Sequence, residues 1–152
     1  MSRYLNPLEA LNRLRNEWAK YGSIIVAFDV DSTVLPFHQS EYKDDYEPIR
    51  QLLRDLKLLG CTLIAFTAAE EGRWDKIKEQ LDTIKVPYDY FNESPETIPH
   101  IVKMGKVYAN AYLDDRGGMY ELFMMLTILV LEEKARRFEE AAKTAMKLAK
   151  SY

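Results

Sequence analysis

Short, continuous runs of apolar residues alternate along this chain with longer segments of helical periodicity, and this alternation limits the fold more than any other feature. Ile24–Phe28 and Cys61–Phe66 are runs of the kind found in strands that are buried on both faces. Pro48–Leu59 and Arg73–Ile84 instead carry apolar residues three and four positions apart, which is typical of amphipathic helices. The alternation predicts β–α–β units with right-handed crossovers, and therefore an α/β protein with a parallel sheet.

The remaining segments complete this expected architecture. Tyr88–Phe91 and Val107–Leu113 are the third and fourth candidate strands. Pro7, preceded by Asn6, begins a helix that Gly22 ends, and a fourth helix begins at Met119 and continues to about Lys150. We expect a three-layer Rossmann-like domain with a central parallel sheet of four or five strands, helices on both faces and a long C-terminal helix.

Length and composition indicate one ordinary globular domain. The 152 residues suffice for one hydrophobic core, with an N-terminal helix over 1–22, a core over 23–118 and a C-terminal helix over 119–152. The net charge of −3 provides no overall positive field for nucleic acid or acidic membranes. Cys61 is the only cysteine, which excludes an internal disulfide and favours a reducing compartment.

No segment has the features of membrane attachment or export. The most apolar stretch, 122–131, is about half of the ~20 residues that span a bilayer. The first residues lack the apolar segment of a secretory signal. We therefore expect a cytoplasmic protein that does not bind a membrane.

Polar side chains follow three of the four predicted strands. Asp29 and Asp31 come after the first strand, Thr67 follows the second, and Asp114 and Asp115 follow the fourth. Ligands of parallel α/β sheets bind beyond the carboxyl ends of the strands. The sequence therefore predicts a site at this edge of the sheet.

Four carboxylates at one edge would repel each other unless a cation lay between them. An all-oxygen ligand set favours Mg²⁺ over Zn²⁺, so we predict a magnesium site. His38 and His100 are far apart and have no metal-ligand partner at close spacing, so we expect both at the surface. The predicted metal ligands are Asp29, Asp31, Asp114 and Asp115.

Two acids on one strand end permit a two-step phosphoryl transfer. Asp29 and Asp31 point the same way along an extended chain, so one carboxylate can attack the phosphorus while the other donates and accepts protons. Attack of a carboxylate on phosphorus forms an aspartyl-phosphate, and a second carboxyl group can protonate the leaving oxygen. The Thr67 hydroxyl, a lysine, backbone N–H groups and the metal can stabilise the charge on the phosphoryl group.

These residues, in this order, resemble the four motifs of the haloacid-dehalogenase-like (HAD) superfamily of phosphohydrolases. The first motif is an Asp-x-Asp-x-Thr run after an apolar strand, the second a Thr after another strand, the third a Lys, and the fourth an Asp pair. The matching residues are Asp29, Asp31, Thr33, Thr67, Lys106, Asp114 and Asp115. The resemblance covers roughly Ser23 to Gly118 and implies a HAD-like fold.

For the acids, the resemblance implies distinct roles. Asp29 would be the nucleophile and a metal ligand, and Asp31 the general acid and base, with its backbone carbonyl on Mg²⁺. Asp114 would be the main fourth-motif metal ligand, and Asp115 would act on the metal through water.

For the phosphoryl group, the resemblance implies that Thr67 holds an oxygen and that Lys106 offsets charge. Lys103 competes for the lysine role, but Lys106 has the better spacing to the fourth motif. Ala68 stands in the loop where the family often has Gly or Asn, so this loop departs from the pattern, and we still predict Ala68 to be a substrate-binding residue. Arg73 lies close enough in sequence to bind a substrate phosphate.

The substrate is less constrained than the chemistry. Only about thirteen residues (35–47) separate the first motif from its helix, so no cap domain fits, and an open site suits a bulky or macromolecular phosphate. The first and fourth motifs also resemble the phosphatase part of phage-type polynucleotide kinase/phosphatases, which implies a nucleotide or a nucleic-acid terminal phosphate as substrate. A capless protein phosphatase, transfer to an acceptor other than water and a non-catalytic interaction module of the same fold remain alternatives.

The helix after Met119 is longer than a small sheet, at about 45 Å for a rise of 1.5 Å per residue. Its first half has a broad apolar face that would pack on the sheet, and its second half is highly charged. We expect part of this helix to project and to offer a surface for a homodimer.

Overall fold

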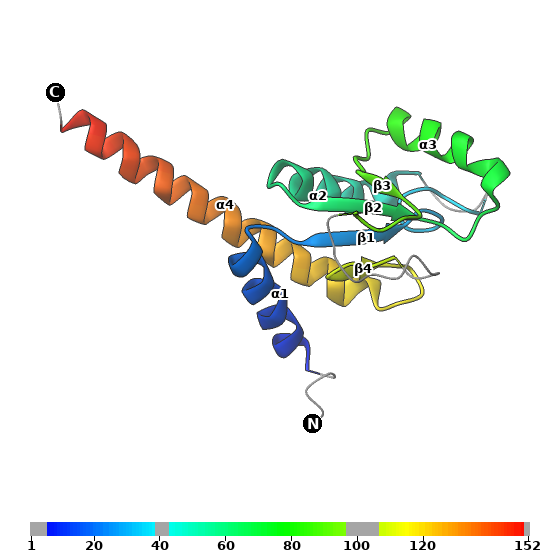
Figure 1. Cartoon of the computed structure of the whole chain (residues 1–152), viewed down its shortest axis with the longest axis horizontal. Helices are drawn as coiled ribbons and strands as arrows, with labels where there is room; N and C mark the ends of the chain where they lie inside the picture. Colours follow the sequence, from blue (N-terminus) through cyan, green and yellow to red (C-terminus); the bar gives the residue numbers. More distant parts are fainter. Residues whose placement is uncertain (1–5, 39–42, 97–106, 151–152) are drawn as a thin grey trace.

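Figure 1 shows the computed structural model, which describes residues 6–38, 43–96 and 107–150. The strands are β1 (Ile25–Asp29), β2 (Thr62–Phe66), β3 (Tyr90–Phe91) and β4 (Ala111–Leu113). The α-helices are α1 (Pro7–Tyr21), α2 (Glu47–Leu58), α3 (Trp74–Thr83) and α4 (Met119–Ala149). Two short 3-10 helices, η2 (Lys43–Tyr46) and η3 (Glu71–Arg73), precede α2 and α3.

The four strands form one parallel sheet in the order β3-β2-β1-β4. This order confirms the predicted parallel sheet, with four strands in the described part of the chain. β1 and β2 lie in the centre, and the three middle residues of each are buried. Such burial on both faces is the physical reason for the continuous apolar runs in the sequence.

β4 is shorter than the predicted Val107–Leu113. The Tyr112 hydroxyl donates to the carbonyl of Val107 at 2.6 Å and accepts from the backbone N–H of Ala109 at 3.0 Å. A side chain therefore satisfies backbone groups that a longer strand would have paired with β1. The Asn110 side chain next to it accepts from the Ile25 N–H at 2.7 Å and so closes the start of the pairing between the two strands.

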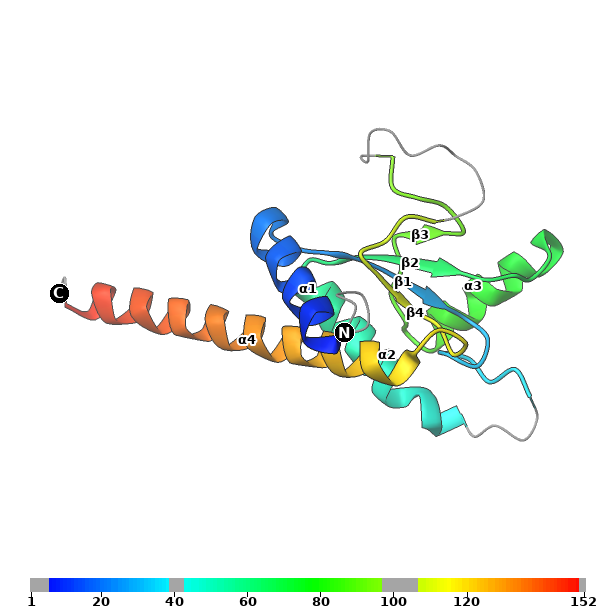
Figure 2. The same cartoon turned by 90° about the horizontal axis from the view of Figure 1, so that it is seen from below.

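Helices flank the sheet. α2 and α3 lie on one face, α1 lies on the other side, and α4 runs past the β4 edge (Figures 1 and 2). There α4 contacts α2, β4 and α1. The buried side chains of these helices and strands form one hydrophobic cluster, which agrees with a single Rossmann-like α/β core.

The first helix begins and ends where the sequence predicts. The Asn6 side chain accepts from the Leu8 N–H at 3.0 Å, and Pro7 stands in the first turn. Gly22 has φ +79° and donates its N–H to the Trp18 carbonyl at 2.8 Å. Only glycine adopts this left-handed conformation without strain, so the residue ends α1.

Only the first half of α4 packs against the domain. Its buried side chains end at Glu133, which accepts from Arg136 and from Arg137, and Arg137 also donates to the Leu59 carbonyl at 2.7 Å. Beyond this point the helix projects from the rest of the molecule (Figure 1). None of the described helices, α4 included, combines the length and apolar character needed to cross a membrane.

Candidate functional site

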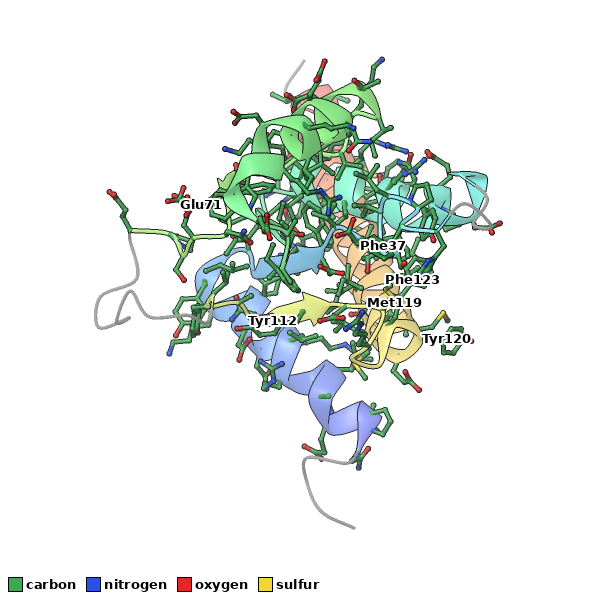
Figure 3. All side chains as sticks on the ribbon, turned by 90° about the vertical axis from the view of Figure 1, so that its right-hand side faces the viewer. Phe37, Glu71, Tyr112, Met119, Tyr120 and Phe123 are labelled. Atoms are coloured by element: carbon green, nitrogen blue, oxygen red, sulfur yellow. The ribbon has the colours of Figure 1, made fainter. Side chains whose placement is uncertain are left out.

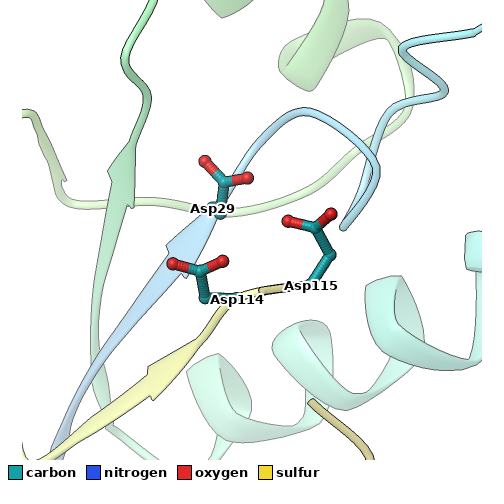
Figure 4. Close-up of side chains that lie close together, drawn as sticks. All are labelled: Asp29, Asp114 and Asp115. Atoms are coloured by element: carbon teal, nitrogen blue, oxygen red, sulfur yellow. The ribbon is translucent and has the colours of Figure 1, made fainter. Parts of the chain in front are cut away.

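The ends of β1 and β4 bring three carboxylates together. Phe28 pairs with Leu113 in the sheet, so the next residues in register are Asp29 and Asp114. Carboxylate oxygens of Asp29, Asp114 and Asp115 lie within 4.8 Å of one another (Figure 4). This separation would let a single cation contact all three residues. The convergence predicted for Asp29, Asp114 and Asp115 is therefore present.

The electrostatics of Asp29 show what this proximity costs. Burial is the largest cause of a rise in the pKa of its carboxyl from 3.8 to about 6. The negative charges of Asp114, Asp115 and Asp31 contribute to the same rise, while a backbone hydrogen bond from Val30 works against it. A second backbone donor, the N–H of Arg116, bonds to Asp114 Oδ1 at 2.9 Å. A divalent cation would neutralise the repulsion, and the all-oxygen donor set fits Mg²⁺ as well as other hard cations.

Asp31 lies apart from the three clustered carboxylates. A tight loop follows β1, in which Ser32 has φ +55° and donates its N–H to the Leu35 carbonyl at 2.8 Å. The N–H groups of Val34 and Leu35 both donate to the Val30 carbonyl. This loop places Asp31 at the wall of a cleft beside the carboxylate cluster, so the two acids of the first motif face different surroundings. A metal bond from the Asp31 backbone carbonyl stays a prediction.

Thr67 lies buried just beyond the end of β2, next to the strand that carries Asp29. Its hydroxyl accepts from the Ala69 N–H at 3.1 Å. The Asn92 side chain accepts from the Thr67 N–H at 2.8 Å and donates to the Thr67 carbonyl at 3.1 Å. Asn92 has φ +53°, a conformation that asparagine tolerates better than most residues. The sequence analysis missed Asn92, although an Asn directly after a strand is a usable signal for such a brace.

A cleft of about 510 Å³ opens between the loop after β1 and helix α3. Its volume lies within the range of small-molecule sites. It contains Asp31 and the predicted substrate residue Arg73 together, whereas Ala68 is exposed and does not line it. Its lining residues are Asp31, Leu35, Pro36, Phe37, Arg50, Arg73, Lys76, Ile77, Glu79, Gln80, Thr83 and Ile84.

Figure 3 looks onto the end of the sheet at which these groups lie. Phe37, at the mouth of the cleft, lies on the same side of the sheet end as Phe123 and Met119 at the start of α4. The Phe37 ring is 55% exposed. Apolar side chains therefore gather on one side of this end of the sheet.

Two residues predicted for the third motif lie outside the part of the chain that the structure describes. Lys103 and Lys106, the candidates for the motif lysine, fall in residues 97–106, as does His100. His38 is exposed beside the Phe37 ring, which agrees with its expected place at the surface. The Thr33 hydroxyl of the first motif is fully buried and has no hydrogen-bond partner among the described residues.

Comparisons with known proteins bear on the fold of the chain and not on its chemistry. No family model matches the chain, and no curated protein matches it. Among solved structures, a conserved protein from Bacteroides thetaiotaomicron is similar, with a TM-score of 0.51 and 20% identity. The match covers 62% of this chain and 78% of that protein. At this identity the likeness supports the Rossmann-like α/β fold alone.

Proposed function

We propose that this protein is a HAD-like, Mg²⁺-dependent phosphatase that hydrolyses a phosphomonoester through an aspartyl-phosphate on Asp29. The observation that carries the proposal is the convergence of the Asp29, Asp114 and Asp115 carboxylates at adjoining strand ends. Bound Mg²⁺ would neutralise these carboxylates and the phosphate and would polarise the phosphorus–oxygen bond. Among phosphomonoesters, the resemblance of the first and fourth motifs to phage-type polynucleotide kinase/phosphatases favours a nucleotide or a nucleic-acid terminal phosphate.

Asp29, Asp31 and Thr67 have different roles in the proposed reaction. An Asp29 oxygen attacks phosphorus while the bond to the leaving oxygen breaks, and the Asp31 carboxyl gives that oxygen its proton. Asp31 then takes a proton from the water that attacks the phosphorus of the aspartyl-phosphate, which releases phosphate and restores Asp29. The Thr67 hydroxyl would bond a phosphoryl oxygen, and the Asn92 bridge keeps the Thr67 backbone in place.

The order of the two acids has a physical basis. Asp29 ends β1 among the clustered carboxylates, where a cation would keep it ionised for attack. Asp31 is half-buried at the cleft wall, on the side where the leaving group of a substrate would lie. Because the two carboxylates have different surroundings, Asp29 can remain an ionised nucleophile while Asp31 donates and accepts protons.

The test is turnover of p-nitrophenyl phosphate and of a panel of nucleotides, 3′-phosphorylated oligonucleotides, phosphopeptides and sugar phosphates, with Mg²⁺ or with EDTA. We expect turnover with Mg²⁺ alone, and none from Asp29→Asn. Asp75→Asn is the matched control, because Asp75 is an exposed aspartate on the first turn of α3. A wild-type protein that is inert on every substrate, or an Asp29→Asn variant as active as the wild type, would overturn the proposal.

A further inference from the structure

The cleft beside Asp31 carries more positive charge than the rest of this acidic protein. Arg50, Arg73 and Lys76 line it, against the carboxylates of Asp31 and Glu79. Arg73 and Lys76 form no ion pair with any residue that the structure describes. Their charges are therefore available to an anion in the cleft.

Arg50 is the buried member of this set. Its side chain is 8% exposed, and its Nε donates to the Val34 carbonyl of the loop after β1 at 2.9 Å. Its Nη1 lies 3.6 Å from the Glu47 carboxylate, which is too long for a good hydrogen bond. A guanidinium that is nearly buried and incompletely bonded, in the wall of a cleft, is a strong donor for an anion.

The positions along α3 give the cleft a direction. Thr67 directly follows β2 at the carboxyl edge of the sheet, and η3 and α3 then lead the chain away from that edge (Figure 1). Arg73 and Lys76 stand at the near end of the cleft. Counted from Lys76, Gln80 and Thr83 stand about 6–10 Å further along at 1.5 Å per residue. The cations thus share the cleft with Asp31, on the side where the leaving group of a substrate would begin.

We propose that this cleft binds a second phosphate of the substrate, so that the preferred phosphomonoester has a leaving group that is itself phosphorylated. This inference rests on the proposed function and deepens it. A nucleoside 3′,5′-bisphosphate and a 3′-phosphorylated oligonucleotide share this chemistry: one phosphate is cleaved beside Asp29, and the next lies one sugar away, at Arg73 and Lys76. Arg50, which donates to the loop that carries Asp31, would lie in the cleft wall beside this second phosphate.

The test compares three substrates under Mg²⁺: a nucleoside 3′-monophosphate, a nucleoside 3′,5′-bisphosphate and a 3′-phosphorylated dinucleotide. We expect the KM for the two substrates with a second phosphate to be about tenfold lower than that for the monophosphate. The reason is that each of the two ion pairs, with Arg73 and with Lys76, should lower the KM by about fivefold or less. The double variant Arg73→Gln/Lys76→Gln should remove this preference. Lys147→Gln, an exposed lysine near the far end of α4, is the charge-matched control and should keep it.

The comparison of the bisphosphate with the dinucleotide separates the two possible sources of the second phosphate. A preference for the bisphosphate alone indicates a small-molecule substrate, and an equal or stronger preference for the dinucleotide indicates a nucleic-acid end. Equal KM values for all three substrates, or a preference that survives in the double variant, would overturn the cleft proposal while leaving the phosphatase intact.

A binding measurement keeps the two proposals apart. Calorimetry of the bisphosphate with Asp29→Asn reports on the cleft without turnover. We expect the bisphosphate to bind Asp29→Asn and not the triple variant Asp29→Asn/Arg73→Gln/Lys76→Gln, and equal binding to both would overturn the cleft proposal. A wild type that hydrolyses nothing would instead overturn the proposed function, and with it the identity of the bisphosphate as a substrate.

A separate observation concerns α4, which presents a continuous apolar stripe to solvent. The stripe follows steps of three, four and seven residues and lies opposite the side chains that α4 buries. Its large members are between 40% and 77% exposed. The stripe consists of Tyr120, Met124, Leu131, Ala135, Phe138, Ala142, Met146 and Ala149.

The projecting part of this stripe is complementary to itself. In an antiparallel pair with a two-fold axis near residues 140–141, each large side chain meets an alanine of the second copy. Leu131 lies opposite Ala149, Phe138 opposite Ala142, and Met146 opposite Ala135. Large residues facing small ones is the arrangement that packs helices without voids.

The charges beside the stripe fit the same pairing. Glu139 and Lys143 stand on one flank of the stripe, and the same two-fold axis places Glu139 of one copy beside Lys143 of the other. We infer that the projecting half of α4 forms an antiparallel homodimer through this stripe. The packing pairs centre near residue 140 and the charge pair on residue 141, so two independent features of the sequence place the axis within about one residue of each other.

Sedimentation equilibrium of the full chain from about 10 µM to about 500 µM tests the dimer. We expect a dimer that Phe138→Glu abolishes. Glu139→Lys and Lys143→Glu should each weaken the Kd about fivefold, and the double swap should restore it. Lys147→Glu, which lies off the stripe, is the control. A monomer over the whole range, or a dimer that Phe138→Glu leaves intact, would overturn the inference.

Discussion

Replacing Asp29 by asparagine should stabilise the metal-free protein while it removes the nucleophile. Raising the pKa of the Asp29 carboxyl from 3.8 to about 6 corresponds to about 3 kcal/mol for a group fully shielded from solvent. Because Asp29 is only half-buried, solvent screening reduces this to about 1.5 kcal/mol. Asparagine has nearly the same shape and carries no charge, so Asp29→Asn should recover about this amount.

The pH dependence follows from the direction of the pKa shift. The native state holds the Asp29 proton more tightly than the unfolded state, so between about pH 4 and pH 6 the unfolded chain has fewer protons bound. The contribution of this group to stability is therefore present at low pH and is lost as the pH rises through about 6. The stability difference between Asp29→Asn and wild type should be near zero at pH 4 and about 1.5 kcal/mol at pH 7.5.

Urea unfolding in EDTA at both pH values measures this difference. For an m-value of about 1.5 kcal/mol/M, the midpoint of Asp29→Asn should lie about 1 M above that of the wild type at pH 7.5. Mg²⁺ at ten times its Kd should then raise the wild-type stability by about 1.4 kcal/mol and raise that of the variant less. Asp75→Asn should show neither effect. The reasoning is refuted if metal-free Asp29→Asn is the less stable protein at pH 7.5, or if Mg²⁺ stabilises both proteins equally.

Three further predictions concern other described residues. Thr33→Val replaces a buried hydroxyl without a described partner by a methyl group of similar shape, so urea unfolding should show a gain of about 1 kcal/mol, and a loss would mean that the hydroxyl is bonded. Asn92→Ala removes both hydrogen bonds to the Thr67 backbone and should cost about 1–3 kcal/mol in the same assay and lower kcat; an unchanged midpoint would contradict this role. The Arg136 and Arg137 guanidinium groups lower the pKa of Glu133 to about 2, so its contribution to stability is present above about pH 4.5 and is lost as the pH falls toward 2. Glu133→Gln should therefore destabilise the protein at pH 7 and match the wild type near pH 2, and an equal deficit at both pH values would refute the assignment.

Much of the fold follows from local features of the sequence. The apolar runs, the helical periodicity and the Asn6–Pro7 and Gly22 signals predict the elements and the parallel sheet, because burial and capping act within a few residues. The same reasoning places acids after β1 and β4. It misplaces the start of β4, where the Tyr112 hydroxyl satisfies the backbone in place of a strand partner.

The sequence by itself determined which residues reach the carboxyl edge of the sheet, because each strand delivers the residues that directly follow it. Only the tertiary structure decided which of them meet. Strand register joins Asp29 to Asp114 and Asp115, and the loop after β1 carries Asp31 into a cleft with Arg50, Arg73 and Lys76. Arg50 and Asn92 act through contacts with residues 16 and 25 positions away in the sequence, respectively, and only the folded chain brings these partners together. Proximity across strands and helices depends on packing and register, and these are properties of the whole chain.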